Sequence, residues 1–156
     1  KRYYCNDCHE IFYTNPNMVV GALCIRDNKI LLAKRNIQPR KGLWTLPAGF
    51  LENAETLQEG ALRETFEETR WKVSILGLLG IAFVHNSIGK TYLRHTFLAN
   101  PIELDKTAKL DSDIISTHWL RLEEIMALSD QLRTPIVLEA IKWHRSGVTY
   151  PIDLFK

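Results

Sequence analysis

The segment GFLENAETLQEGALRETFEETR, residues 49–70, joins a glycine turn to the clearest helix signal in the chain. Thr56 is followed three residues later by Glu59, and this spacing is typical of a capping box. In that motif each side chain binds a backbone N–H at the start of the helix. We therefore expect a helix from about Thr56 to Thr69 and assign Glu59 to capping rather than to chemistry.

Three glutamates gather on one side of this predicted helix. An ideal helix advances about 100° per residue, which places Glu64, Glu67 and Glu68 within one sector. Like charges at this spacing repel on an exposed helix, so the cluster is unfavourable unless something else uses it. We expect the opposite face to pack against the rest of the protein. The residues on that face are Leu62, Phe66 and Thr69.

Composition bounds the possible functions before any motif is considered. The 156 residues carry a formal charge of +2 and are 46% hydrophobic, which fits one soluble domain. A near-neutral chain has no general basic field, so we expect no nucleic-acid and no membrane binding. The longest apolar run, residues 75–84, is too short to span a bilayer, which needs about 20 residues.

Cysteine usage and the chain start suggest a compartment. Three cysteines are too few for the disulfide framework of a small secreted domain. The chain starts at Lys1 with no charged segment followed by an apolar core, so we expect a trimmed start and no signal peptide. The prediction is a cytoplasmic protein.

Strand and helix patterns alternate irregularly along the rest of the chain, which predicts a mixed sheet with helices on both faces. Residues 1–17 show neither periodicity and form the expected N-terminal arm, and residues 18–156 form the expected domain. Residues 26–29 and 86–89 are expected turns, and residues 36–49 and 100–113 are expected loops. The expected strands are 18–25, 30–33, 44–46, 73–85, 92–100 and 115–120, and the further helices are 122–128 and 134–143.

The polar positions of residues 49–70 follow a fixed spacing. Gly49 is followed after five residues by Glu55, and after seven more by Arg63 and the glutamates. This pattern resembles the Nudix box, G-x5-E-x7-R-E-U-x-E-E-x-G-U, in which U is apolar. Two positions depart from it, because Thr65 replaces an apolar residue and Arg70 replaces glycine. We expect the helix to run on to about Arg70, which avoids a left-handed residue there.

The resemblance implies a Nudix fold, an α/β/α sandwich around a mixed sheet, and a metal-dependent hydrolase. It implies that Glu64, Glu67 and Glu68 hold Mg²⁺ or Mn²⁺, with the Ala48 carbonyl as a further ligand. Arg63 would pair with Glu55 to orient these ligands. The proton acceptor stays open, and the candidates are Glu64, Glu67 and Asp113.

Two parts of the chain resemble different Nudix branches. Residues 39–50 (PRKGLWTLPAGF) with 63–65 resemble the branch that carries an N-terminal zinc ribbon, which implies substrates such as ADP-ribose, FAD or NADH. Residues 111–155, with His118-Trp119 and Tyr150-Pro151, resemble a small bacterial Nudix phosphatase. That branch implies nucleoside triphosphates or a thiamine-precursor pyrophosphate. We take a nucleoside diphosphate linked to another group as the first expectation and the phosphatase as the alternative.

Several further residues have both a functional and a structural interpretation. Arg35, Arg40 and Lys41 could bind the diphosphate or could be solvated charges. Trp44 and Phe83 could stack on a base, although aromatic strand residues usually belong to the core. Gly49 completes the substrate-binding candidates. We expect His85, His95, Cys24, Trp119 and Trp143 to be packed structural residues.

Cys5 and Cys8 have the two-residue spacing of a zinc knuckle, and His9 follows. A structural zinc site needs four ligands, so this pair would be half of one. The alternative is a pair of free thiols in a loose arm. A non-catalytic module that senses a ligand or binds through a zinc ribbon is the rival function, although the intact box glutamates favour an enzyme. A homodimer is a possible assembly.

Overall fold

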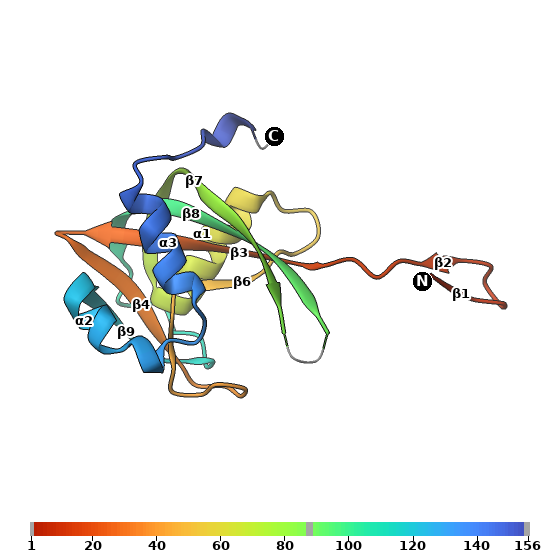
Figure 1. Ribbon diagram of the computed structural model, residues 1–156, viewed down its shortest axis with the longest axis horizontal. Helices are drawn as coiled ribbons and strands as arrows, with labels where there is room; N and C mark the ends of the chain where they lie inside the picture. Colours follow the sequence, from red (N-terminus) through yellow and green to blue (C-terminus); the bar gives the residue numbers. More distant parts are fainter. Residues whose placement is uncertain (1, 87–88, 155–156) are drawn as a thin grey trace.

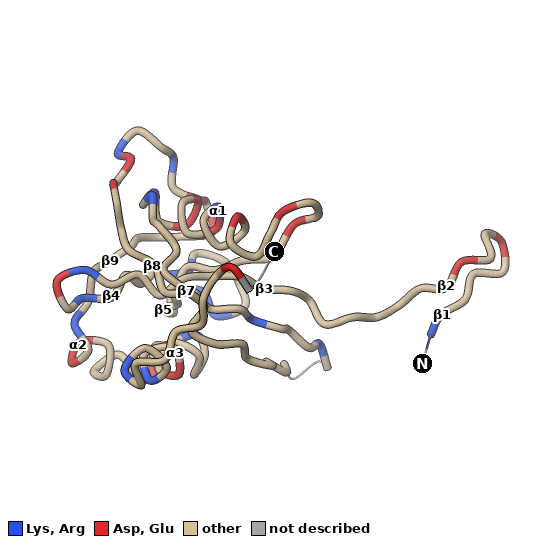
Figure 2. Tube along the Cα trace, turned by 90° about the horizontal axis from the view of Figure 1, so that it is seen from above, with Lys and Arg blue, Asp and Glu red and all other residues tan. Residues whose placement is uncertain are grey.

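A seven-stranded mixed sheet forms the centre of the structure, a computed structural model that describes residues 2–86 and 89–154 (Figure 1). Helix α1 covers one face, and α2 and α3 cover the other (Figures 1 and 2). The predicted α/β/α architecture is confirmed. The strands of the sheet are β3 (Asn17–Arg26), β4 (Lys29–Arg35), β5 (Trp44–Thr45), β6 (Ala48–Phe50), β7 (Trp71–His85), β8 (Thr91–Leu104) and β9 (Ile114–Arg121). The helices are α1 (Leu57–Thr69), α2 (Leu122–Ala127) and α3 (Ile136–Arg145), with short 3₁₀ turns η1 (Ser129–Gln131) and η2 (Ile152–Leu154).

Strand β3 organises the sheet. It pairs in parallel with β8 along residues 17–24, and its antiparallel contact with β4 is confined to residues 25–26 beside the turn. The other side of β3 pairs with the short β6. Strands β3 and β4 therefore diverge, and the segment that carries β5 and β6 fills the space between them.

Hydrophobic cores lie on both faces of the sheet, because successive strand residues point to opposite sides. Leu78 packs with Phe97 and Ala61 beneath α1, whereas its neighbour Leu79 packs with Val137 beneath α3. Cys24 is fully buried, as predicted, and burial raises the pKa of its thiol to about 12.

The predicted β3–β4 turn is present. Asp27 and Asn28 both have positive φ, 50° and 58°, which these short polar side chains tolerate in tight hairpin turns. In the second predicted turn, residues 87 and 88 lie outside the described part of the chain. The capping box is confirmed, since the Glu59 N–H donates to Thr56 Oγ1 at 3.2 Å and the Thr56 N–H donates to Glu59 Oε2 at 2.8 Å.

Helix α1 corrects two of the expectations. The side of α1 that carries Glu64, Glu67 and Glu68, here called the glutamate sector, adjoins the packed face rather than opposing it. The buried residues of the helix are Gly60, Ala61, Thr65, Glu68 and Thr69. Leu62, expected in the core, is exposed, because the sheet lies on the side of Ala61 and Thr65.

The predicted end of α1 was wrong. Arg70 has φ 63° and lies in the left-handed region, and its N–H donates to the Phe66 carbonyl at 2.6 Å. Strand β7 begins at Trp71 with no intervening loop, and the Asp105 N–H donates to the Arg70 carbonyl at 2.9 Å. One left-handed residue makes this sharp turn, which a continued helix could not make.

Three segments expected to be irregular contain strands. Residues 48–50 form β6, and β8 continues through Pro101 to Leu104 because a register shift beside Val73 accommodates the proline. The N-terminal arm ends in a small hairpin of β1 (Tyr3–Tyr4) and β2 (Ile11–Phe12) that extends away from the sheet (Figure 1). Within the described part of the chain, no helix is long and apolar enough to cross a membrane.

Candidate active site

Arg63, in the middle of α1, is the centre of a hydrogen-bonded cluster. Its Nε and Nη2 donate to the two Glu55 carboxylate oxygens at 3.0 and 2.7 Å, and Nη2 also donates to the Phe50 carbonyl at 3.0 Å. Nη1 donates to Glu64 at 2.8 Å and to Glu67 at 3.3 Å. The predicted pair of Arg63 with Glu55 is confirmed, and it fastens the loop before the helix to the glutamate sector.

The Glu55 carboxylate is fixed from two sides. Besides Arg63, it accepts the Glu52 N–H at 2.7 Å. The hydrogen bonds from Arg63 hold the pKa of Glu55 below its usual value. Glu55 therefore stays ionised and keeps Arg63 in place. Figure 2 shows the acidic residues of this loop and of α1 close together.

Glu64 lies against the backbone of β6. A Cβ atom on Gly49 would be only 2.0 Å from Glu64 Oε2, so the missing side chain at position 49 is what admits this carboxylate. The Glu64 side chain is 13% exposed, and burial raises its pKa despite the hydrogen bond from Arg63. A carboxylate held in this way gains from a nearby positive charge.

Glu68 is the most buried acid of the site, at 7% exposure. Its Oε2 accepts the Ala48 N–H at 2.9 Å, and burial raises its pKa to about 7. Glu67 differs, since its side chain is 48% exposed and faces solvent beside Arg63. Its backbone carbonyl accepts the Asp111 N–H at 3.1 Å, which brings the segment before β9 to the end of α1.

The donor chemistry of this sector fits a hard divalent cation. Carboxylate oxygens are the ligands that Mg²⁺ and Mn²⁺ prefer, and Glu64 and Glu68 are desolvated acids with raised pKa values. Among residues 2–86 and 89–154, no group of three or more His, Cys, Asp or Glu side chains converges into a metal cluster. Arg63 is the cation that Glu64 and Glu67 share in this arrangement.

The predicted substrate-binding residues fall into two groups. Arg35 is buried at the end of β4, where its charge acts on Glu68, and Gly49 lies against Glu64, so both border the glutamate sector. Trp44 is 9% exposed and packs in the core under α3, which supports its structural interpretation. Phe83 is 67% exposed, so the expectation of a core aromatic was wrong there. Strand β7 extends beyond the helices toward the β7–β8 turn (Figure 1).

The loop from β4 to β5 carries the other two basic candidates. Arg40 and Lys41 are exposed, and Arg40 Nη1 donates to the Arg133 carbonyl. Asp113 is half-buried, and its backbone carbonyl accepts the Asn36 N–H at 2.6 Å. This contact places the alternative proton acceptor beside the end of β4.

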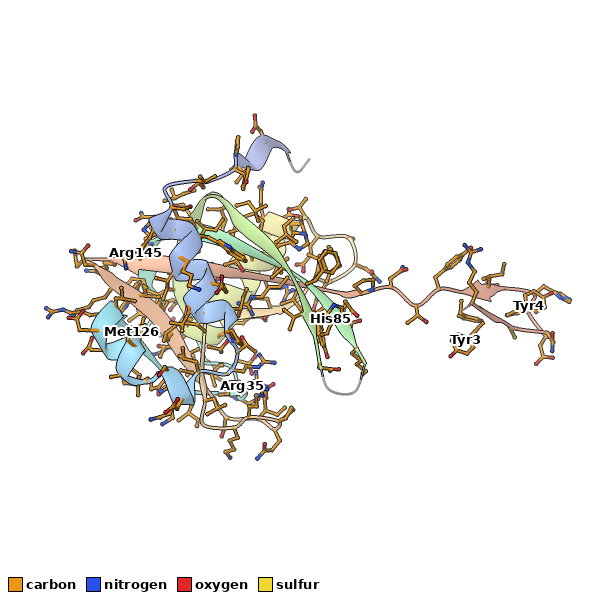
Figure 3. The ribbon with its side chains drawn as sticks, in the orientation of Figure 1. Tyr3, Tyr4, Arg35, His85, Met126 and Arg145 are labelled. Atoms are coloured by element: carbon orange, nitrogen blue, oxygen red, sulfur yellow. The ribbon has the colours of Figure 1, made fainter. Side chains whose placement is uncertain are left out.

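Cys5 and Cys8 lie in the loop of the β1–β2 hairpin and are free thiols. His9 is hydrogen-bonded through Nδ1 to the Tyr4 hydroxyl at 2.7 Å. His95 is buried as expected, but His85 is exposed near the tip of the β7–β8 hairpin (Figure 3). Zinc binding by the cysteine pair stays a prediction.

Two arginines that the sequence analysis did not select border the same region. Arg94 on β8 is 7% exposed, and Arg133 before α3 is half-buried. The charge of Glu68 acts on both and raises their pKa values, against the larger lowering effect of burial. The sequence around Arg94, Leu-Arg-His within an apolar strand, gives only a weak signal for a functional arginine. The ordinary alternation of polar and apolar residues along strands already predicts some polar residues there.

Known proteins are similar to this chain in both fold and sequence. A profile of the NUDIX domain matches residues 15–143. The curated protein "Phosphatase NudJ" of Escherichia coli K12 is 35% identical over 142 residues, covering 89% of this chain and 90% of its own. A NUDIX hydrolase structure from Nitrosomonas europaea has TM-score 0.87 and 34% identity, covering 91% of this chain and 97% of its own.

A more distant structure shares the fold alone. It is the bifunctional NMN adenylyltransferase/ADP ribose pyrophosphatase of Francisella tularensis, complexed with AMP and a manganese ion. Its TM-score is 0.67 at 24% identity, and the match covers 83% of this chain and 42% of that one.

The fold and the glutamate helix thus define a class of hydrolase that generally uses divalent metal ions and acts on small nucleotide-type substrates. This chain belongs to the Nudix family and is a pyrophosphohydrolase acting on phosphorus-containing anhydrides.

Proposed function

We propose that this protein hydrolyses a phosphoanhydride bond of a small nucleotide-type molecule with Mg²⁺ or Mn²⁺ bound at α1. Glu64, Glu67 and Glu68 would hold the metal, with the Ala48 carbonyl. The observation that carries the proposal is the desolvated Glu64 carboxylate, which lies against Gly49 and accepts a hydrogen bond from Arg63. When bound, such ions polarise a phosphoryl oxygen and activate water.

The residues of the chain have distinct parts in this proposal. Arg63 positions Glu64 and is itself positioned by Glu55. Glu68 is anchored to β6 by the Ala48 N–H. The proton acceptor is Glu64, Glu67 or Asp113, each of which lies in or beside the glutamate sector.

Two substrate classes are candidates. The first is a nucleoside diphosphate linked to another group, such as ADP-ribose, FAD or NADH. The second comprises nucleoside di- and triphosphates and the thiamine-precursor pyrophosphate. The similarity to phosphatases at 35% identity favours the second class, since it covers nearly the whole chain.

A substrate panel with matched variants tests the proposal. ADP-ribose, FAD, NADH, nucleoside triphosphates and the thiamine-precursor pyrophosphate would be assayed with Mg²⁺ and with Mn²⁺. We expect Glu64→Gln and Glu68→Gln each to stay folded and to lose most turnover, because the neutral amide keeps the shape but not the charge.

The matched control is Glu123→Gln, which makes the same change at an exposed residue of α2 and should turn over normally. Near-normal activity of both box variants, or full activity in a chelator, would contradict the proposal.

A further inference from the structure

Three arginines outside the Nudix box lack the partners that buried cations usually have. Arg35 and Arg94 are 9% and 7% exposed, and Arg133 is half-buried. Arg35 Nε and the Nε and Nη2 atoms of Arg94 are buried without a hydrogen-bond partner. Within residues 2–86 and 89–154, none of the three forms an ion pair with a carboxylate.

The backbone brings these arginines together from distant parts of the chain. The N–H of Arg35, at the end of β4, donates to the Leu43 carbonyl at 3.0 Å. The N–H of Arg133 donates to the Trp44 carbonyl at 2.8 Å, so the two arginines border β5. Figure 3 shows Arg35 beside the loop that follows β4.

Arg94 reaches the same region from the other side. It lies on β8 opposite Val19 of β3, and β3 also pairs with β6, whose Ala48 holds Glu68. Burial lowers the pKa of Arg94 to about 10, and the nearby charge of Arg133 adds to this effect. Burial also lowers the pKa of Arg133, with an added effect from the charge of Arg35. Glu68 is the carboxylate whose charge acts on Arg94 and Arg133 together.

Unpaired buried guanidinium groups require a counter-charge, because burial of a charge without a partner is strongly unfavourable. Even a fully ionised Glu68 would leave two of the three arginine charges uncompensated. A terminal phosphate group carries nearly two negative charges at neutral pH and offers three unesterified oxygens. Arginine forks match phosphate oxygens with paired hydrogen bonds. A phosphate esterified on both sides carries one charge and two such oxygens, which leaves part of the cluster unpaired.

We propose that Arg35, Arg94 and Arg133 form a subsite for the terminal phosphate of the substrate, beside the glutamates of α1. The subsite selects pyrophosphate and triphosphate monoesters over molecules in which both phosphates are esterified. This inference rests on the proposed function, because it assigns the substrate class of the same site.

The first test measures binding without turnover. Inorganic pyrophosphate would be titrated calorimetrically into the full chain in the presence of a chelator. We expect Arg133→Gln to weaken binding about 10-fold or more, which is the effect of one lost charge-assisted hydrogen bond. Arg133 is half-buried, so this variant keeps the test meaningful if Arg94→Gln does not fold. Arg145→Gln, at an exposed arginine of α3, is the matched control and should bind as the unmodified chain does.

The second test measures selectivity with ADP and ADP-ribose, which differ in whether the outer phosphate is esterified. We expect kcat/KM to favour ADP, and Arg133→Gln to lower kcat/KM for ADP, chiefly through KM, far more than for ADP-ribose. Equal losses on both substrates, or pyrophosphate binding that Arg133→Gln leaves unchanged, would overturn the subsite. Absence of all metal-dependent turnover would instead overturn the proposed function. The calorimetric titration would still test whether the three arginines bind pyrophosphate.

Discussion

At position 70 an arginine occupies a backbone conformation that usually belongs to glycine. A left-handed residue with a Cβ atom costs roughly 1–2 kcal/mol, and glycine gives back part of that through the entropy of the unfolded chain. Arg70 Nε is also buried without a hydrogen-bond partner. The residue is kept in this state by the direct passage from α1 to β7.

We therefore expect Arg70→Gly to stabilise the protein by about 0.5–1 kcal/mol. Urea denaturation of the two proteins measures the difference. Arg70→Ala serves as the control, since it removes the same side chain but keeps the Cβ atom. If the glycine variant is no more stable than the alanine variant, the backbone strain argued here is absent.

At this scale the sequence predicted the charged cluster but not its surroundings. The resemblance of residues 49–70 to the Nudix box was enough to predict one ion pair, between Glu55 and Arg63. Burial of Glu68 and the approach of Arg94 depend on strands that are distant in the sequence, and no local pattern contains that information. The left-handed Arg70 was missed for the same reason, because its cause is the start of β7.

At the scale of elements, the Glu55–Arg63 pair connects the loop of residues 51–56 to α1. Helix α1 could be predicted from its capping box, and the β3–β4 hairpin from its polar turn. Strand β6 could not, since three residues after a proline show no periodicity and pair only because β3 diverges from β4. The site is thus assembled from one helix that the sequence predicts and one strand that it does not.

This connection predicts an order of effects on catalysis. Glu55→Gln should reduce turnover by about 10 to 100-fold, which is usual for residues that orient metal ligands. Glu68→Gln should reduce it more, because Glu68 is a proposed ligand. Steady-state assays of both variants, with the exposed Glu52→Gln from the same loop as control, measure the order. A larger loss for Glu55→Gln would reverse the roles assigned here.

The Glu55–Arg63 pair also makes the stability of the folded protein depend on pH. The folded-state pKa of Glu55 lies below the usual value of 4.5, so its contribution is fully present above that pH and is lost as the pH falls through the lower folded pKa. Glutamine does not titrate, so Glu55→Gln should lose less stability than the unmodified chain between pH 6 and roughly pH 3. Urea midpoints across this range measure the slopes, and identical slopes would show that Glu55 is not held ionised by Arg63.

At the scale of the whole molecule, strands β1 and β2 form a two-stranded sheet that is separate from the seven-stranded sheet. Side chains of the β1–β2 hairpin are exposed, among them Tyr3, Tyr4 and Phe12. Figure 1 shows this hairpin extending away from the start of β3. The cores lie entirely within the residues from β3 onward.

Removal of residues 1–14 should therefore leave a folded domain whose thermal midpoint is close to that of the full chain. Turnover of the preferred substrate should be preserved as well, since the described catalytic contacts involve none of these residues. Calorimetric melting and the same assay measure both. A large drop in the midpoint would mean that the arm packs on the domain.

The parallel pairing of β3 with β8 has a consequence for the order of folding. It joins residues 17–24 to residues 92–99, so the middle of the sheet closes only after most of the chain is available. Pairings of such long range are slow to form, whereas the β3–β4 and β7–β8 hairpins are local. During synthesis, one edge of β3 therefore stays unpaired until β8 has left the ribosome. Until then, helix α1 has no completed sheet to pack against.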